Sequence, residues 1–174
     1  QLDLPPGVGL LRKQVTDALM SAAGQLPDGY QLLIMDTYRS VAVQTKKFHE
    51  CLKPFLAQYP YEQAYWKASV FVAPPDIAPH CTGGAVDVTL MYQGKPLDMG
   101  SHYIQIDETS QTISDTISID AQVNRVMLAT VMLDAGFVNY PNEWWHWSIG
   151  DRYYGVIKDM PAPYGIKEVV DNEY

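Results

Sequence analysis

Three segments of the chain place apolar residues every three to four positions, the spacing that gives an α-helix one buried face. The first covers about residues 10–26 and the third about residues 120–135, which Gly136 follows as a helix-ending residue. The second runs from residue 41 toward residue 59, and Pro54 is expected to kink this helix or end it near Lys53. The apolar positions that carry these predictions are Leu11, Val15, Ala18, Leu19 and Ala22, then Phe48, Leu52 and Phe55, then Val123, Val126, Met127, Val131 and Leu133.

Shorter apolar segments predict β-strands. Residues 32–35 form a continuous apolar run that ends at Asp36, as in a buried strand. Residues 85–90 alternate strictly, which places Asp87 on the face opposite Val86, Val88 and Leu90. Residues 137–140 and 144–149 predict two more strands around a turn at Pro141-Asn142. The pattern as a whole predicts an α+β fold in which about three helices flank an antiparallel sheet.

The length and composition fit one compact domain spanning residues 1–174. A chain of 174 residues, 47% of them hydrophobic, can bury a full core, and a second core would need more chain. No run approaches the ~18 apolar residues of a membrane-spanning helix, so no membrane insertion is expected.

The charge is acidic and uneven. The chain carries 12 Lys and Arg against 20 Asp and Glu, and residues 68–174 hold 14 of the acidic groups but only 5 of the basic ones. Such a surface repels a phosphate backbone, so nucleic acid is excluded as an expected partner and a small or neutral substrate is favoured.

The cysteines and the start of the chain bear on its compartment. An exported protein would carry Cys51 and Cys81 as one disulfide, whereas a cytosolic protein would keep two separate thiols. The chain starts at Gln1 without a signal-peptide pattern, so such a peptide has been removed or was never present. We therefore expect a periplasmic or secreted protein, with the cytoplasm as the alternative. The sequence does not specify an oligomeric state.

Two of the four histidines lie near acidic residues in segments rich in glycine or tryptophan. A catalytic zinc takes three ligands from His, Asp, Glu or Cys and leaves one position open. His80, Asp87 and His146 would supply that set, with one zinc per chain. The Gly83-Gly84 pair lets the chain turn sharply between His80 and the strand that carries Asp87. The predicted antiparallel sheet would therefore carry a zinc site.

Two further residues suit hydrolysis at such a site. Glu143 is three residues before His146 and can accept and deliver a proton. Because positions i and i+3 of a flat strand face opposite sides, Glu143 must lie in the turn or at a bulge. Arg39 follows a buried strand and suits a guanidinium that polarises a scissile carbonyl.

Four segments, in this order and spacing, resemble a known family, the zinc D-alanyl-D-alanine dipeptidases of the vancomycin-resistance type. They are Asp36-Thr-Tyr-Arg39, the segment from His80 to Leu90, Asp98-Met-Gly-Ser101 and Glu143-Trp-Trp-His146. The resemblance implies zinc on His80, Asp87 and His146, acid and base catalysis by Glu143, and transition-state stabilisation by Arg39. It also implies a peptidoglycan-derived D-amino-acid peptide as the substrate.

The chain departs from this family at positions implied in substrate recognition. Ala78 stands where the family usually has a serine, and Ile104 where it has an aspartate. One interpretation is that Asp107 or Glu108 takes over the role of the family's aspartate in holding the substrate. The other is that the free amino terminus of a dipeptide is not recognised and a longer stem peptide is accepted.

The functional hypothesis is therefore zinc-dependent hydrolysis of D-alanyl-D-alanine or a related peptidoglycan bond. One alternative is a D,D- or L,D-carboxypeptidase or endopeptidase that acts on longer muropeptides. The other is a non-catalytic binding module stabilised by zinc, against which Glu143 argues because a structural zinc site needs no general base. His102 is expected to be an exposed loop residue, and the tryptophans Trp144, Trp145 and Trp147 to form core or pocket wall.

Overall fold

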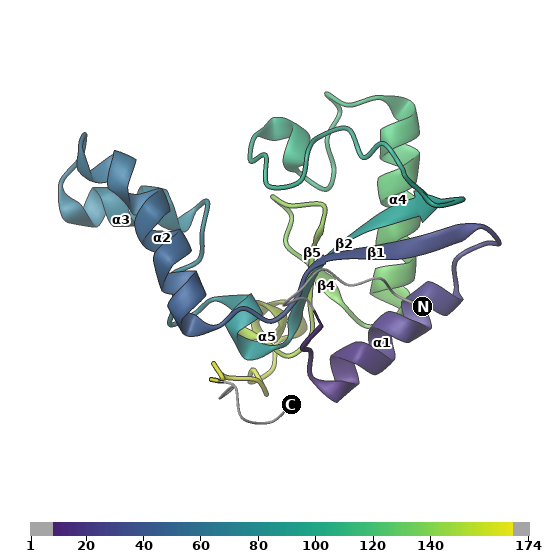
Figure 1. Cartoon of the computed structure of the whole chain (residues 1–174), viewed down its shortest axis with the longest axis horizontal. Helices are drawn as coiled ribbons and strands as arrows, with labels where there is room; N and C mark the ends of the chain where they lie inside the picture. Colours follow the sequence, from purple (N-terminus) through teal and green to yellow (C-terminus); the bar gives the residue numbers. More distant parts are fainter. Residues whose placement is uncertain (1–8, 169–174) are drawn as a thin grey trace.

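The computed structural model describes residues 9–168, so Gln1 and the rest of residues 1–8 and 169–174 lie outside the described part (Figure 1). The α+β prediction is confirmed, and the sheet is antiparallel. The helices of the described residues are α1 (Lys13–Gly24), α2 (Val41–Leu56), α3 (Tyr61–Ser69), α4 (Ile119–Asp134) and α5 (Arg152–Lys158), with the short 3-10 helices η1 (Pro79–Thr82) and η2 (Glu108–Ser110). The strands are β1 (Tyr30–Asp36), β2 (Ala85–Tyr92), β3 (Lys95–Pro96), β4 (Val138–Asn139) and β5 (His146–Ser148).

The sheet has the order β1-β2-β5-β4, with the short β3 paired to β2. β2 is therefore central, and both of its faces are covered over residues 85–90. The main core lies between this sheet and the helices α1 and α4, which contact each other, and it contains Phe137, Leu128 and Val88. The described part of the chain contains no helix long and apolar enough to cross a membrane.

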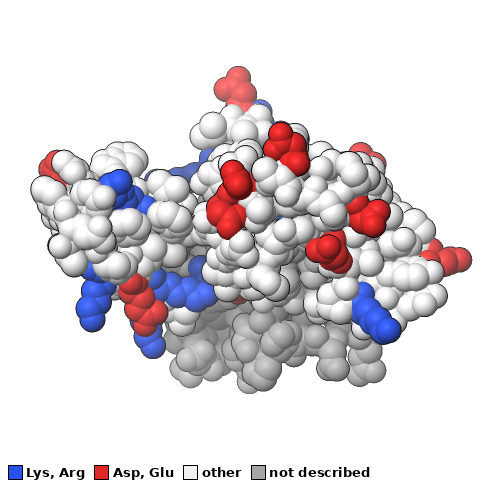
Figure 2. Space-filling model, turned by 90° about the horizontal axis from the view of Figure 1, so that it is seen from above, with Lys and Arg blue, Asp and Glu red and all other residues white. Residues whose placement is uncertain are grey.

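The α2–α3 hairpin has a small core of its own and extends away from the sheet (Figure 1). Phe48 and Leu52 of α2 pack there with Ala64 and Ala68 of α3. The visible acidic side chains spread over the body, while several Lys and Arg side chains lie toward the hairpin, at the left of Figure 2. The hairpin therefore forms an arm beside the body of the fold.

The prediction of about three helices is wrong, because the described residues form five α-helices. α3 buries only small alanines and exposes Trp66, so its sequence has no broad apolar stripe. α5 is seven residues long and begins at a cap where Asp151 accepts a hydrogen bond from the Tyr154 amide.

Three local predictions can also be compared with the structure. Pro54 does not end α2, which continues to Leu56. The strands expected at residues 137–140 and 144–149 are present but shorter. Gly136 follows α4 with a φ of 93°, and the amides of Gly136 and Phe137 donate to the carbonyls of Leu133 and Met132, which confirms the predicted helix end.

Candidate active site

Three polar residues form a row across the sheet. Asp87 of β2 pairs with Asp36 of β1 on one side and with His146 of β5 on the other. Directly paired residues project to the same face of a sheet, so these side chains lie side by side. A bulge in β1 shifts the register after Ile34 and places Asp36, rather than Met35, opposite Asp87.

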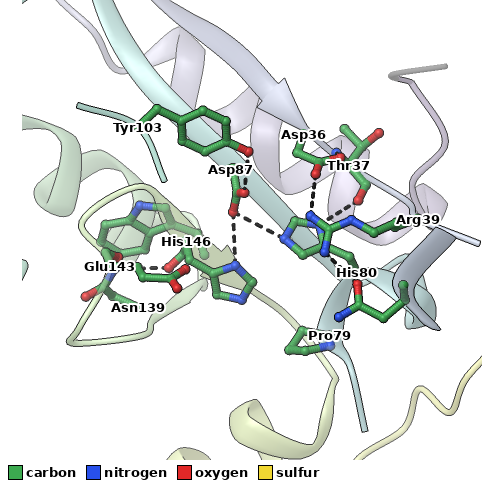
Figure 3. A network of polar contacts seen from close by, with 12 residues as sticks. Asp36, Thr37, Arg39, Pro79, His80, Asp87, Tyr103, Asn139, Glu143 and His146 are labelled. Carbon is green, nitrogen blue, oxygen red and sulfur yellow. Dashed lines mark hydrogen bonds and ion pairs between the residues drawn. The ribbon is translucent and has the colours of Figure 1, made fainter. Parts of the chain in front are cut away.

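His80 joins this row from η1. Gly83 ends η1 with a φ of 69°, and the chain then enters β2, as the glycine pair predicted. The Nε2 atom of His80 lies 3.3 Å and the Nδ1 atom of His146 lies 3.0 Å from the Oδ1 atom of Asp87 (Figure 3). All three residues are buried, and the atoms they offer to a metal lie within 4.8 Å of one another.

The surrounding groups fix the orientation of this cluster. The Nδ1–H of His80 donates to the Thr37 carbonyl at 2.6 Å, which leaves its Nε2 atom directed at the cluster. The hydroxyl of Tyr103 donates to the Oδ2 atom of Asp87 at 2.9 Å. Burial disfavours the charged form of Asp87, yet the two histidines hold the pKa of its carboxyl well below its usual range. Two imidazole nitrogens and one carboxylate oxygen are ligands that Zn²⁺ takes in catalytic sites, so the donor set fits zinc.

Glu143 lies in the turn between β4 and β5, as the spacing to His146 required. Its amide donates to the Tyr140 carbonyl, and its carbonyl accepts from the His146 amide. The side chain of Asn139 also donates to the carbonyls of Glu143 and His146, at 3.1 and 3.0 Å. Burial raises the pKa of the Glu143 carboxyl, so its proton is released at a higher pH than that of an exposed glutamate.

Arg39 lies in the loop between β1 and α2 and is held at two points. Its guanidinium pairs with the Oδ2 atom of Asp36 at 2.5 Å and donates to the side-chain oxygen of Gln44 at 2.6 Å. The side-chain nitrogen of Gln44, Nε2, in turn donates to the Ala73 carbonyl, beyond α3. A guanidinium has five N–H donors, so others remain available to a ligand.

One cavity of about 650 Å³ connects these groups. Its lining contains all five predicted site residues, which are Arg39, His80, Asp87, Glu143 and His146. Ala78 and Ile104 also line it, whereas Asp107, Glu108 and His102 are not among its lining residues. Asp107 instead accepts hydrogen bonds from Thr109 and Gln105, and His102 is exposed, as predicted.

Sequence reasoning did not assign roles to four residues that organise the site. These are Asp36 and Gln44 beside Arg39, Thr37 beside His80, and Tyr103 beside Asp87. Asp36 and Thr37 belong to the Asp36-Thr-Tyr-Arg39 motif, which could have drawn attention to them. Gln44 shares the buried face of α2 with Phe48 and Leu52, where a polar residue is unusual and signals a specific contact.

The tryptophans, the Asp98–Ser101 motif and the cysteines named in the sequence analysis contribute to the packing of the fold. Trp144, Trp145 and Trp147 are all buried, and Trp145 also lines the cavity. Ser101 accepts a hydrogen bond from the Trp144 indole at 2.9 Å, so the Asp98–Ser101 motif braces the core. The two cysteines are free thiols, Cys51 half-buried in α2 and Cys81 buried in η1, so the disulfide alternative is not supported.

A His, Asp and His cluster beside a carboxylate and a guanidinium in one cavity is typical of a mononuclear zinc hydrolase. Comparison with known proteins agrees with this class. Residues 7–162 match the family described as D-ala-D-ala dipeptidase, and the chain belongs to this family.

Curated relatives carry the same description. A D-alanyl-D-alanine dipeptidase of Synechocystis sp. is 32% identical, covering 80% of this chain and 67% of its own length. The D-alanyl-D-alanine dipeptidase of Escherichia coli is 33% identical, covering 80% of this chain and 66% of its own length. The chain thus spans about two thirds of the length of these relatives.

Solved structures share the fold. VanYB in complex with D-alanine-D-alanine has a TM-score of 0.54 at 18% identity, over 91% of this chain and 89% of that one. The vancomycin-resistance D,D-pentapeptidase VanY in complex with Zn(II) has a TM-score of 0.54 at 21% identity, over 83% and 75% of the two chains. The LD-carboxypeptidase LdcB has a TM-score of 0.56 at 20% identity, over 94% and 72%.

Proposed function

We propose that this protein is a zinc-dependent peptidase that hydrolyses the peptide bond of D-alanyl-D-alanine in peptides derived from the cell wall. The observation that carries the proposal is the convergence of His80, Asp87 and His146 with Glu143 and Arg39 on one cavity. Family membership and the names of the curated relatives support the substrate.

His80 through Nε2, Asp87 through Oδ1 and His146 through Nδ1 would hold the zinc. When bound, zinc supplies a Lewis acid that polarises the scissile carbonyl and lowers the pKa of water. The hydrogen bonds from His80 to Thr37 and from Tyr103 to Asp87 keep these ligand atoms in place before the metal arrives.

Glu143 would move the protons of the reaction. The carboxylate would take a proton from the attacking water and then deliver it to the nitrogen of the leaving amino acid. Its position in a turn braced by Asn139, rather than on a strand, directs the side chain into the same cavity as His146. The raised pKa moves the carboxyl closer to neutrality, where a group can both accept and release a proton.

Arg39 would stabilise the negative charge that develops on the carbonyl oxygen. Asp36 and Gln44 hold the guanidinium rigidly, so little reorganisation is needed when that charge appears. A zinc-stabilised binding module would need neither this anchored guanidinium nor Glu143, and the arrangement therefore favours an enzyme.

The compartment of the protein is part of the proposal. A cell-wall peptide is most accessible to a periplasmic or secreted enzyme, and this substrate is what supports export. The two free thiols add no support to it. Cell fractionation that finds the protein only in the cytoplasm would contradict this part of the proposal.

Hydrolysis of D-alanyl-D-alanine peptides by the zinc-loaded protein tests the main proposal. We expect release of D-alanine from the free dipeptide or from a longer peptide that ends in D-alanyl-D-alanine, and loss of that activity after chelation. The stereochemical control is the matching set of peptides that end in L-alanyl-L-alanine. Failure to cleave any D-alanyl-D-alanine peptide with zinc bound would overturn the proposed function.

A further inference from the structure

The cavity extends well beyond the predicted zinc ligands. We call the part lined by the buried His80, Asp87 and His146 the inner end, and the part lined by the exposed Lys47 and Glu50 of α2 and by Phe71, which follows α3, the outer end. A volume of about 650 Å³ lies within the ~300–1,000 Å³ range of sites that bury drug-sized ligands. Two alanines would leave much of that space unfilled.

The charges of the lining show which end of a peptide fits near the zinc ligands. Among the described residues, the carboxylates that line the cavity are Asp87, Glu143 and Glu50. Both oxygens of Asp87 already have partners, namely the two histidines and Tyr103. Glu143 is assigned to proton transfer. No lining carboxylate near the zinc ligands therefore remains to pair with a substrate ammonium group.

A free dipeptide would place its ammonium group in this inner region, because the amino group and the scissile carbonyl belong to the same alanine. Ala78, which is buried, and Ile104, which is largely exposed, line the cavity with apolar side chains, and neither offers the ammonium group a partner. A charge buried without a partner is costly, whereas the neutral amide of a longer peptide requires only a hydrogen bond. The inner region thus favours an amide over an ammonium group at this position.

Glu50 lies farther out, on the same helix as Gln44. Gln44 holds Arg39 at the inner end, and six residues of helix place Glu50 about 9 Å farther along α2. An extended peptide covers about 3.3 Å per residue, so this distance corresponds to nearly three residues. Figure 1 shows α2 leading away from the sheet in this direction. A cationic group on a residue that precedes the two alanines can therefore reach Glu50.

We propose that the cavity binds the D-alanyl-D-alanine end of a longer peptide, whose preceding residues lie along α2 and whose amino-bearing side chain pairs with Glu50. This inference rests on the proposed function and narrows its substrate class. In the reaction, the C–N bond between the two alanines breaks, the carbonyl carbon gains the hydroxyl of water, and the amine gains the proton. The products are free D-alanine and the shortened peptide.

The test compares three substrates with the zinc-loaded protein. They are free D-alanyl-D-alanine, Nα-acetyl-L-lysyl-D-alanyl-D-alanine, and the same tripeptide with its ε-amine also acetylated. We expect kcat/KM to be at least about tenfold higher for the tripeptide with the free amine than for the dipeptide, because the dipeptide buries an unpaired ammonium group. Acetylation of the ε-amine should reduce this advantage by about two- to fivefold, the value of an exposed ion pair.

Two matched variants locate the contact. Glu50→Gln should lower the ratio of kcat/KM between the free-amine and the diacetylated tripeptide toward one. Glu62→Gln should leave the ratio unchanged, since Glu62 is exposed on the neighbouring helix α3 and is not among the lining residues.

The outcomes separate this inference from the proposed function. Equal or faster cleavage of the free dipeptide would overturn the inference and leave the peptidase proposal standing. A ratio that does not change in Glu50→Gln would overturn the placement of the side chain at Glu50. Cleavage of none of the three substrates would overturn the proposed function and the inference together.

Discussion

Tyr103 provides a quantitative test of how the site is organised. Its hydroxyl donates to the Oδ2 atom of Asp87, while the Oδ1 atom of Asp87 faces His80 and His146. Burial and the nearby Asp87 carboxylate raise the pKa of Tyr103, so the hydroxyl keeps its proton and acts as a donor at all working pH values. The substitution Tyr103→Phe removes only this donor and keeps the ring that packs against Trp145.

The expected magnitude follows from the type of hydrogen bond. A hydrogen bond to a charged group contributes ~1.5–3 kcal/mol, and a buried carboxylate oxygen without a partner costs a similar amount. Part of this loss affects the metal-free protein as well, so the free energy of unfolding should fall by about 1–2 kcal/mol. The rest affects the orientation of Asp87, and loss of such an outer hydrogen bond typically weakens metal binding by ~10–100-fold.

Zinc affinity can be measured by competition with a chromophoric chelator, and stability by urea unfolding of the metal-free protein. Tyr164→Phe is the matched control, because the Tyr164 hydroxyl donates to Gln14 at an exposed position and Tyr164 is not among the cavity-lining residues. If Tyr103→Phe bound zinc and unfolded like the wild type, the proposed role of this hydrogen bond would be refuted.

Three further predictions concern Arg39, His146 and the two cysteines. Arg39→Lys keeps the positive charge but loses the planar guanidinium that Asp36 and Gln44 hold, so kcat should fall by ~10²–10³ with an unchanged zinc content. A fall in kcat under about twofold would argue against transition-state stabilisation by Arg39. Burial alone would lower the pKa of His146, but the hydrogen bond and the charge of Asp87 outweigh burial and raise that pKa. The metal-free protein should therefore lose stability as the pH rises from about 6.5, the pKa of an unfolded histidine. Zinc displaces that proton, so Tm scans should show the loss only without zinc, and a metal-free Tm that rises over this range would contradict the sign. Burial raises the pKa of Cys81 to about 11, so a thiol reagent should modify the half-exposed Cys51 first and Cys81 only on unfolding, as mass spectrometry would show.

Much of the fold could be predicted from local sequence patterns. The strict alternation around Asp87 predicted β2, and the apolar spacing before Gly136 predicted α4 together with its end. The elements that were missed lack such patterns. α3 buries only small alanines, which pack on the neighbouring helix α2, and α5 is only seven residues long, so neither segment has an apolar periodicity that marks it as a helix.

The residues of the candidate site could be predicted only in part. Residue type and spacing selected His80, Asp87, His146, Glu143 and Arg39, because few side chains bind zinc or move protons, and the structure brings these five residues to one cavity. The groups that orient them were not predictable in the same way. Tyr103 is 16 residues from Asp87 and Thr37 is 43 residues from His80 in the chain, and these contacts arise only from tertiary packing.

The same limit applies to the bulge that brings Asp36 opposite Asp87. Residues 32–35 read as a continuous apolar strand that ends at Asp36, and nothing in their pattern marks the extra residue. The shift becomes visible only when β1 is paired with β2, because it is a mismatch between two strands. Yet the bulge determines which side chain anchors Arg39, and so it shapes the site.

The most direct test of the account is the substitution Glu143→Gln, analysed for zinc content and for hydrolysis of D-alanyl-D-alanine peptides. Glutamine keeps the size of the side chain but cannot accept the proton, and Glu143 is not among the predicted ligands. We expect one zinc per chain, as in the wild type, with turnover reduced by ~10²–10⁴-fold. Wild-type turnover in the zinc-loaded variant would contradict the central claim that Glu143 carries the proton transfer of a zinc peptidase.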